Sequence, residues 1–149
     1  MKKLFLYLFA VSLTFSACSK SDTNSSTSKR ISMTVGGQVK TFNTISVTEE
    51  IFEAGTPDEY TDLMVLATND TDTETISINL EKGVTGTDVI YYLSYTENDN
   101  EYYRTASFNT NVTVNDSSKN LKGTFSGTLQ DSATGSTLTV TNGSFDINY

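Results

Sequence analysis

Histidine and tryptophan are both missing from this chain of 149 residues, and proline and cysteine each occur once. The lack of histidine removes the usual general base of serine and cysteine hydrolases and the commonest transition-metal ligand. Because Cys18 is the only cysteine, no disulfide can form within the chain, and a packed core has to stabilise the fold. We therefore expect a non-enzymatic protein without a cofactor.

Basic residues are few: 10 Lys and Arg stand against 18 Asp and Glu, a net charge of −8. Nucleic-acid binding depends on basic side chains that displace counterions from phosphates, and the sequence has no basic cluster. We therefore expect no nucleic-acid partner. Attraction to anionic lipid surfaces is unfavourable for the same reason.

Long apolar runs are absent except near the N-terminus, where two lysines precede a run over residues 4–15. Such a run is too short for a membrane-spanning helix, which needs roughly 20 residues, but a basic start before a short apolar run is typical of a signal peptide. The following Phe-Ser-Ala-Cys at residues 15–18 resembles a bacterial lipobox. We predict that residues 1–17 are a lipoprotein signal peptide and that Cys18 is lipidated. The alternative is a plain secretory signal cleaved after Ala17.

Lipidation accounts for the single cysteine of an exported protein, and two acyl chains on Cys18 suffice to anchor it to a membrane. Removal of residues 1–17 takes away two of the ten basic residues and no acidic one, which leaves 8 against 18, a net charge of −10. Residues 18–29 hold no apolar side chain beyond the cysteine and are expected to form a flexible polar tether. Residues 30–149 are then a single domain.

This domain reads as a succession of strands, because apolar residues alternate with polar ones between clusters of Gly, Asn and Asp. The first two strands are expected to meet in a tight hairpin at the glycine pair 36–37, since glycine accepts positive φ. The second strand is expected to carry Phe42, Ile45 and Val47.

Two later segments carry finer predictions. Four residues fall on one expected strand face by alternation: Val89, Tyr91, Leu93 and Tyr95. At Asn142-Gly143 the parity of the apolar residues changes, so either a hairpin turns there or a β-bulge shifts the phase of one long strand. The long preceding strand matches an uninterrupted partner, and we favour the bulge.

Eight to ten short strands with short connections predict an all-β fold, because sequential strands usually pair and closure removes exposed edges. An antiparallel β-sandwich and an up-and-down, calycin-like β-barrel both satisfy this pattern.

Three stretches together resemble the small envelope lipoproteins of unknown function common in Bacteroidota: the lipobox with its tether, the opening strands over residues 31–42, and the closing segments 123–127 and 140–145. The resemblance implies an outer-membrane lipoprotein with a β-rich domain, in which ligand or glycan binding is the suspected role. Ser19, directly after the cysteine, resembles outer-membrane sorting signals. Whether the domain faces the periplasm or the cell surface stays open.

Aromatic residues provide the first candidate site. Five tyrosines lie in one predicted hairpin: Tyr91, Tyr92, Tyr95, Tyr102 and Tyr103. Because adjacent residues on a strand face opposite ways, one of each doublet is expected outside. Exposed tyrosines either stack on a ligand such as a sugar or form cross-strand pairs that stabilise the hairpin. The absence of tryptophan favours the cross-strand pairs.

Acidic residues provide two weaker candidates. Asp70, Asp72 and Glu74 have the spacing of calcium ligands in an EF-hand loop, but Thr75 stands where that loop needs glycine, so a solvated turn is favoured. A hydrolase built on carboxylates alone is the remote alternative, with five acids near one loop as candidates: Glu49, Glu50, Glu53, Asp58 and Glu59.

The tripeptide Asp131-Ser132-Ala133, in a predicted loop, resembles an O-glycosylation signal of the same bacterial group and makes Ser132 a candidate acceptor. Taken together, the sequence predicts a membrane-anchored, non-catalytic envelope lipoprotein with an unknown small-molecule, glycan or protein partner. The alternative is a structural or accessory envelope subunit without a small-molecule site.

Overall fold

The computed structural model describes residues 29–149. The predicted signal peptide, the lipidation site Cys18 and the tether up to residue 28 lie outside the described residues. Every regular element between residues 29 and 149 is a strand, and this part of the chain holds no helix of the length and apolar character needed to cross a membrane.

Eleven strands form one antiparallel sheet in the described part of the chain, which confirms the all-β prediction with one strand more than the expected range. Their bounds are β1 Arg30–Val35, β2 Gln38–Phe42, β3 Thr44–Phe52, β4 Tyr60–Thr68, β5 Glu74–Glu81, β6 Gly86–Thr87, β7 Ile90–Glu97, β8 Asn100–Arg104, β9 Asn109–Asn115, β10 Asn120–Asp131 and β11 Thr137–Asn148. The hairpin expected at the glycine pair 36–37 is present between β1 and β2.

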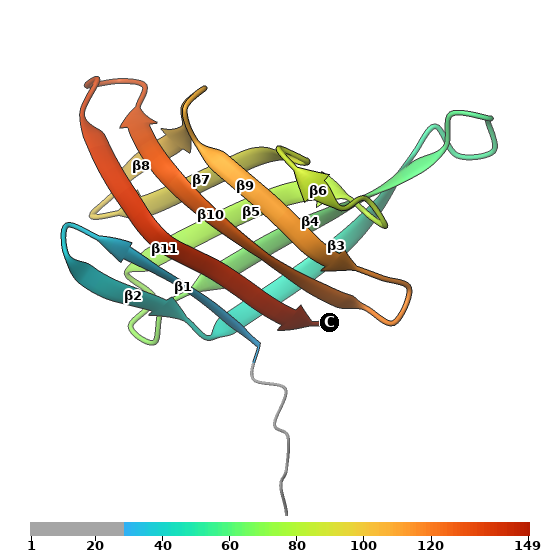
Figure 1. Ribbon diagram of the computed structural model, residues 1–149, viewed down its shortest axis with the longest axis horizontal. Helices are drawn as coiled ribbons and strands as arrows, with labels where there is room; N and C mark the ends of the chain where they lie inside the picture. The colour runs from blue at the N-terminus through green and yellow to red at the C-terminus, as the bar shows by residue number, and fades with distance from the viewer. Residues whose placement is uncertain (1–28) are drawn as a thin grey trace, which may run out of the picture.

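The sheet curls into a half-barrel, with the hydrogen-bonded order β2-β1-β11-β10-β8-β7-β5-β4-β3. Strand β9 pairs with β10 next to β8, and β6 pairs with β9. In Figure 1, β1, β2, β9, β10 and β11 form the near wall, and β3, β4, β5, β7 and β8 cross behind them. Because β2 and β3 end the order without pairing to each other, the barrel stays open along that seam.

The strand expected to carry Phe42, Ile45 and Val47 is two strands. Strand β2 ends at Phe42 and pairs with β1, whereas β3 begins at Thr44 and pairs with β4. The chain therefore passes from one wall of the half-barrel to the other at Asn43. The apolar residues change from even to odd numbers at this point, which is the sequence signal of the break.

A second difference lies in β7, where the prediction that Tyr91 shares a face with Leu93 is wrong. The register against β5 shifts between Asn79 and Leu80, so Tyr91 is an additional residue on β7, a β-bulge. As a result Ile90 enters the core, and Tyr91 stands 53% exposed on the outer face.

The bulge favoured at Asn142 is confirmed, because β11 runs without interruption across it. Asn142 has a φ of 52°, and the register against β10 shifts at this position. A Cβ on the following Gly143 would clash with the carbonyl oxygen of Phe125, so only glycine lets the two strands approach here.

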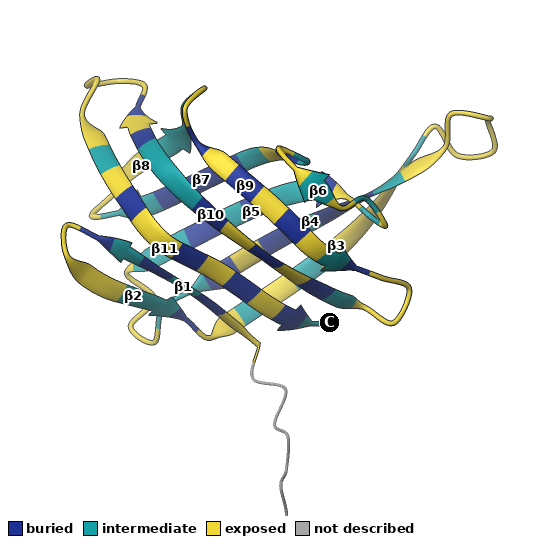
Figure 2. Ribbon diagram, viewed as in Figure 1, coloured by how far each residue is buried: buried dark blue, intermediate teal, exposed yellow. Residues whose placement is uncertain are grey.

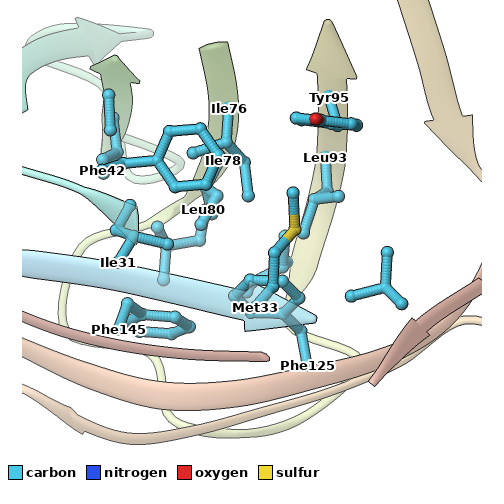
Figure 3. Packing of buried hydrophobic residues seen from close by; sticks show 14 of the residues in the cluster. Ile31, Met33, Phe42, Ile76, Ile78, Leu80, Leu93, Tyr95, Phe125 and Phe145 are labelled. Atoms are coloured by element: carbon cyan, nitrogen blue, oxygen red, sulfur yellow. The ribbon is translucent and has the colours of Figure 1, made fainter. Parts of the chain in front are cut away.

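Apolar side chains from both walls fill the interior. Figure 2 shows buried and exposed residues alternating along the strands, most regularly on β10 and β11. In Figure 3, Ile31 and Met33 of β1 lie in the same space as Leu80 of β5 and Leu93 of β7, and all four are at most 1% exposed. The interior is thus occupied by the core itself, and candidate ligand sites lie on the outer surface.

Candidate functional site

The five tyrosines of the predicted hairpin separate into core and surface residues. Tyr95 is fully buried, with its ring edge-on to Phe42 at a centroid distance of 6.3 Å, and Tyr102 packs against the core. Tyr95 is therefore a core residue, and Tyr102 is half-buried against the core. Tyr91, Tyr92 and Tyr103 lie on the outer face, and the first doublet stays together outside because of the bulge in β7.

Tyr92 and Tyr103 form a self-contained cluster with Glu101. The Tyr103 hydroxyl donates to Glu101 Oε2 at 2.7 Å, and the Tyr92 hydroxyl donates to Oε1 of the same carboxylate at 3.2 Å. The hydrogen bond to Glu101, together with partial burial, raises the pKa of Tyr103 to about 12. Because these groups satisfy one another, the cluster acts as a cross-strand pair that stabilises the hairpin.

Tyr91 instead borders a hollow of about 490 Å³ on the outer face of the half-barrel. This volume lies within the roughly 300 to 1,000 Å³ of typical small-molecule sites. Two tyrosines, two carboxylates and two valines line it: Tyr60, Asp62, Glu81, Val84, Val89 and Tyr91. We name this feature the tyrosine hollow.

Strand register places three carboxylates in a row beside the hollow. Glu50 on β3 and Glu81 on β5 are the residues directly opposite Asp62 on β4. Opposite residues share a face, with Cβ atoms about 4.5 to 5.5 Å apart. Tyr60 precedes Asp62 by two residues, so it lies on the same face, and its ring stacks on Phe52 at a centroid distance of 5.2 Å.

Asp62 is the buried acid of this row, at 7% exposure. Its Oδ2 accepts a short hydrogen bond from the Tyr91 hydroxyl, whereas its Oδ1 is shielded from solvent and has no hydrogen-bond partner within residues 29–149. No described Lys or Arg forms an ion pair with Asp62. A buried acceptor without a partner costs about 1 to 3 kcal/mol, so a hydrogen bond to Oδ1 would be favourable once the side chain exposes that atom to the hollow.

Tyr91 is held as a proton donor in this arrangement. Although 53% of the residue is exposed, its hydroxyl end is turned against Asp62. Desolvation of that end, and then the hydrogen bond to the carboxylate, raise the pKa of Tyr91 to about 12. The phenol therefore keeps its proton to a higher pH than an unperturbed tyrosine does.

The segment 82–89 supplies the apolar side of the hollow and is fixed by Asn115 of β9. Asn115 Nδ2 donates to the carbonyl oxygens of Glu81 at 2.8 Å and of Val84 at 2.9 Å. Asn115 is itself only 6% exposed. Its two hydrogen bonds hold Val84 in place, so the hollow is largely preformed.

Comparison of the chain with protein-family models, with curated proteins and with solved structures finds no match. The chemistry of the tyrosine hollow is therefore the basis for a functional proposal.

A second hollow of about 480 Å³ lies over β1, β10 and β11. Its lining includes Lys122 and Asp146, but Lys122 Nζ already binds Asp146 Oδ2 at 2.9 Å. These two opposite charges compensate each other, in contrast to the unpaired Asp62.

The three carboxylates considered for calcium are each engaged by a different side chain. The pairs are Asp70 with Asn43, Asp72 with Thr68 and Glu74 with Lys40. Within residues 29–149 no three metal-ligating side chains gather in a position to hold a metal ion.

Ser132, the candidate O-glycosylation site, is exposed in the loop between β10 and β11. The neighbouring Asp131 accepts hydrogen bonds from Thr134 Oγ1 at 2.8 Å and from the Ala133 amide at 2.7 Å. These bonds hold the pKa of Asp131 below its usual value. Asp131 thus shapes the loop, while Ser132 stays accessible to a modifying enzyme.

Sequence reasoning identified Tyr91 but missed Tyr60 and Asp62. Their spacing of two residues was the available signal, because it places both on one face of a strand. Their proximity to Tyr91 depends on the β7 bulge, and that bulge was not visible in the apolar alternation.

Proposed function

We propose that the protein is a membrane-anchored, non-catalytic lipoprotein of the outer-membrane envelope whose β-domain binds a small ligand in the tyrosine hollow. Asp62 gives the main support for ligand binding. It is a buried carboxylate whose Oδ1 has no hydrogen-bond partner within residues 29–149, and it lies beside exposed aromatic rings. Small-molecule sites combine apolar and aromatic walls with a few polar groups that fix orientation. Tyr60 and Tyr91 supply contact area, and Asp62 and Glu81 supply the polar groups.

The anchoring half of the proposal is supported by the lipobox-like residues 15–18. Metabolic labelling with a fatty acid tests it, with incorporation expected in the wild-type chain and none in Cys18→Ser. A Cys18→Ser precursor that still took up label would contradict lipidation at this position. Protease shaving of whole cells would then distinguish the periplasmic from the surface orientation.

The binding half is tested by a thermal-shift screen of the full chain, in a non-ionic detergent, against glycans and small metabolites. A true ligand raises the melting temperature by mass action. We expect Tyr60→Ala and Tyr91→Ala to abolish the shift and Tyr103→Phe, on the same outer face, to keep it. A shift that survives both alanine variants would place the ligand elsewhere.

A structural or accessory subunit is the second candidate function, and exposed apolar side chains favour it. The β3–β4 hairpin projects beyond the body of the half-barrel in Figure 1 and carries Ile51, which is 60% exposed. Val39 on the edge strand β2 is 70% exposed. This function predicts that Ile51→Ser lowers crosslinking to a protein partner in intact cells without changing any small-ligand shift.

A further inference from the structure

The tyrosine hollow carries negative charge that the fold does not neutralise. Asp62 lies between Glu50 and Glu81 in register, and like charges directly opposite on a sheet repel. None of the ion pairs formed within residues 29–149 includes any of these three acids. A bound cation would relieve this repulsion.

Aromatic rings flank the same charges. Tyr60 is 37% exposed and Tyr91 is 53% exposed, and stacking on Phe52 fixes the Tyr60 ring. The faces of tyrosine rings attract organic cations, and the attraction grows when water is excluded. The valines at positions 84 and 89 provide an apolar surface for an aliphatic chain.

The protein contains its own example of this chemistry at the other end of the β5–β7 pair. The Lys40 ammonium lies 2.6 Å from Glu74 Oε1 and 2.8 Å from Glu97 Oε1, and these carboxylates adjoin the buried Tyr95. Two carboxylates there bind an ammonium from β2 beside a buried tyrosine. In the hollow, Asp62, Glu81 and Tyr91 receive none from the described chain.

Building on the proposed function, we infer that the ligand of the tyrosine hollow is an organic cation, a primary ammonium or guanidinium group on a short aliphatic chain. Its N–H donors pair with Glu81 and with the Asp62 carboxylate, whose Oδ1 becomes reachable when the side chain turns toward the hollow. Its carbon chain packs on the tyrosines and valines. A neutral sugar fits the aromatic walls but leaves the carboxylate charge unchanged. A bare metal ion lacks a converging set of ligands within residues 29–149.

Titration calorimetry on the full chain in non-ionic detergent tests the inference with matched probes. Cadaverine and agmatine carry the cationic groups, and 1,5-pentanediol is the neutral analogue of cadaverine. We expect saturable binding of both cations and no heat from the diol. Calcium chloride and a panel of neutral sugars complete the set.

Two variants locate the cation and one controls for charge. Asp62→Asn and Glu81→Gln each remove one negative charge from the hollow, and we expect Asp62→Asn to weaken cation binding about tenfold or more. Glu101→Gln removes the same charge from the neighbouring Tyr92–Tyr103 cluster and should leave the affinity unchanged. Because Glu81 is exposed, Glu81→Gln keeps the test valid even if Asp62→Asn were to fold poorly.

The outcomes separate the inference from the function on which it rests. Cation binding that is lost in the hollow variants but kept in Glu101→Gln supports both. Binding of a neutral sugar at the hollow without cation binding overturns the inference and leaves the proposed function standing. Calcium binding that Asp62→Asn abolishes, with no amine binding, overturns the inference in favour of an inorganic ion. If none of the probes binds, both the inference and the proposed function are contradicted.

Discussion

The two ends of the β5–β7 pair hold the same kinds of side chain in opposite states. At one end, on the inner face, Glu74 and Glu97 meet Tyr95 and share the ammonium of Lys40. At the other end, on the outer face, the acid Asp62 meets Tyr91 without a basic partner in the described chain.

The same grouping of carboxylates and a tyrosine thus stabilises the fold at one end and is open to a ligand at the other. Lys40 is 15% exposed and comes from β2 of the near wall, so its ion pairs tie that wall to β5 and β7 of the far wall. The Lys40 cluster therefore belongs to the fold. Asp62 makes no such link, and its unused acceptor suits it to a partner from outside.

Removal of Lys40 should produce the largest effect. Lys40→Met leaves Glu74 and Glu97 close together and poorly hydrated, and breaking a buried ion pair from one side costs about 3 to 5 kcal/mol. Because this cluster keeps some solvent contact, we expect a loss of about 3 kcal/mol in the free energy of unfolding. Urea denaturation at neutral pH measures it, and a loss no larger than that of a surface substitution would contradict the inner cluster's structural role.

The pH dependence of stability should distinguish the Lys40 cluster from the unpaired acids of the hollow. The hydrogen bond from Lys40 lowers the pKa of Glu97, so the stability from this contact is present above the ordinary value of 4.5 and is lost as the pH falls. The same bonds raise the pKa of Lys40 above 10.5, so its contribution is lost only as the pH rises beyond that value. We expect the wild-type chain to lose more stability than Lys40→Met between pH 6 and pH 3 in parallel urea titrations. Equal losses would show that Glu97 is not held by Lys40.

Single carboxylate-to-amide changes should have opposite signs at the two ends. Glu97→Gln weakens a paired charge and should lower the free energy of unfolding by about 1 kcal/mol. Asp62→Asn removes an unpaired charge between two acids while keeping an acceptor for Tyr91, and should raise it by about 0.5 to 1 kcal/mol. Chemical denaturation of both variants decides this, and a marked loss of stability in Asp62→Asn would mean that its charge is compensated within the protein.

The smallest effect is expected at the exposed Glu49, which binds Lys82 at 2.7 Å and Lys119 at 3.7 Å. Exposed ion pairs contribute little and are screened by salt. Glu49→Gln should therefore shift the denaturation midpoint slightly at low salt and not at all in 1 M sodium chloride. A salt-resistant loss would make Glu49 comparable to the Lys40 cluster.

Local sequence patterns predicted most of the fold because strand alternation and turn chemistry are local properties. The hairpin at residues 36–37 and the bulge at Asn142 both follow from residues adjacent in sequence. The break at Asn43 coincides with a change of parity in the apolar residues, which was not recognised as a break. The bulge at Tyr91 was missed because it depends on the pairing of β7 with β5, which the apolar pattern of β7 alone does not carry.

The site was less predictable than the fold for the same reason. Tyr91 was recognised from composition, but its partner Asp62 lies 29 residues away and meets it only through the β7 bulge. Asn115, which fixes the wall of the hollow, is 31 residues from Val84, whose carbonyl it binds. No local spacing encodes either contact.

Amide NMR of the full chain during titration with agmatine tests directly whether an organic cation binds in the tyrosine hollow. We expect saturable shifts confined to the hollow, at residues 60–62, 81–84 and 89–91, and their loss in Asp62→Asn. Shifts centred on the Tyr92–Tyr103 cluster, or no shifts at millimolar agmatine, would contradict cation binding there.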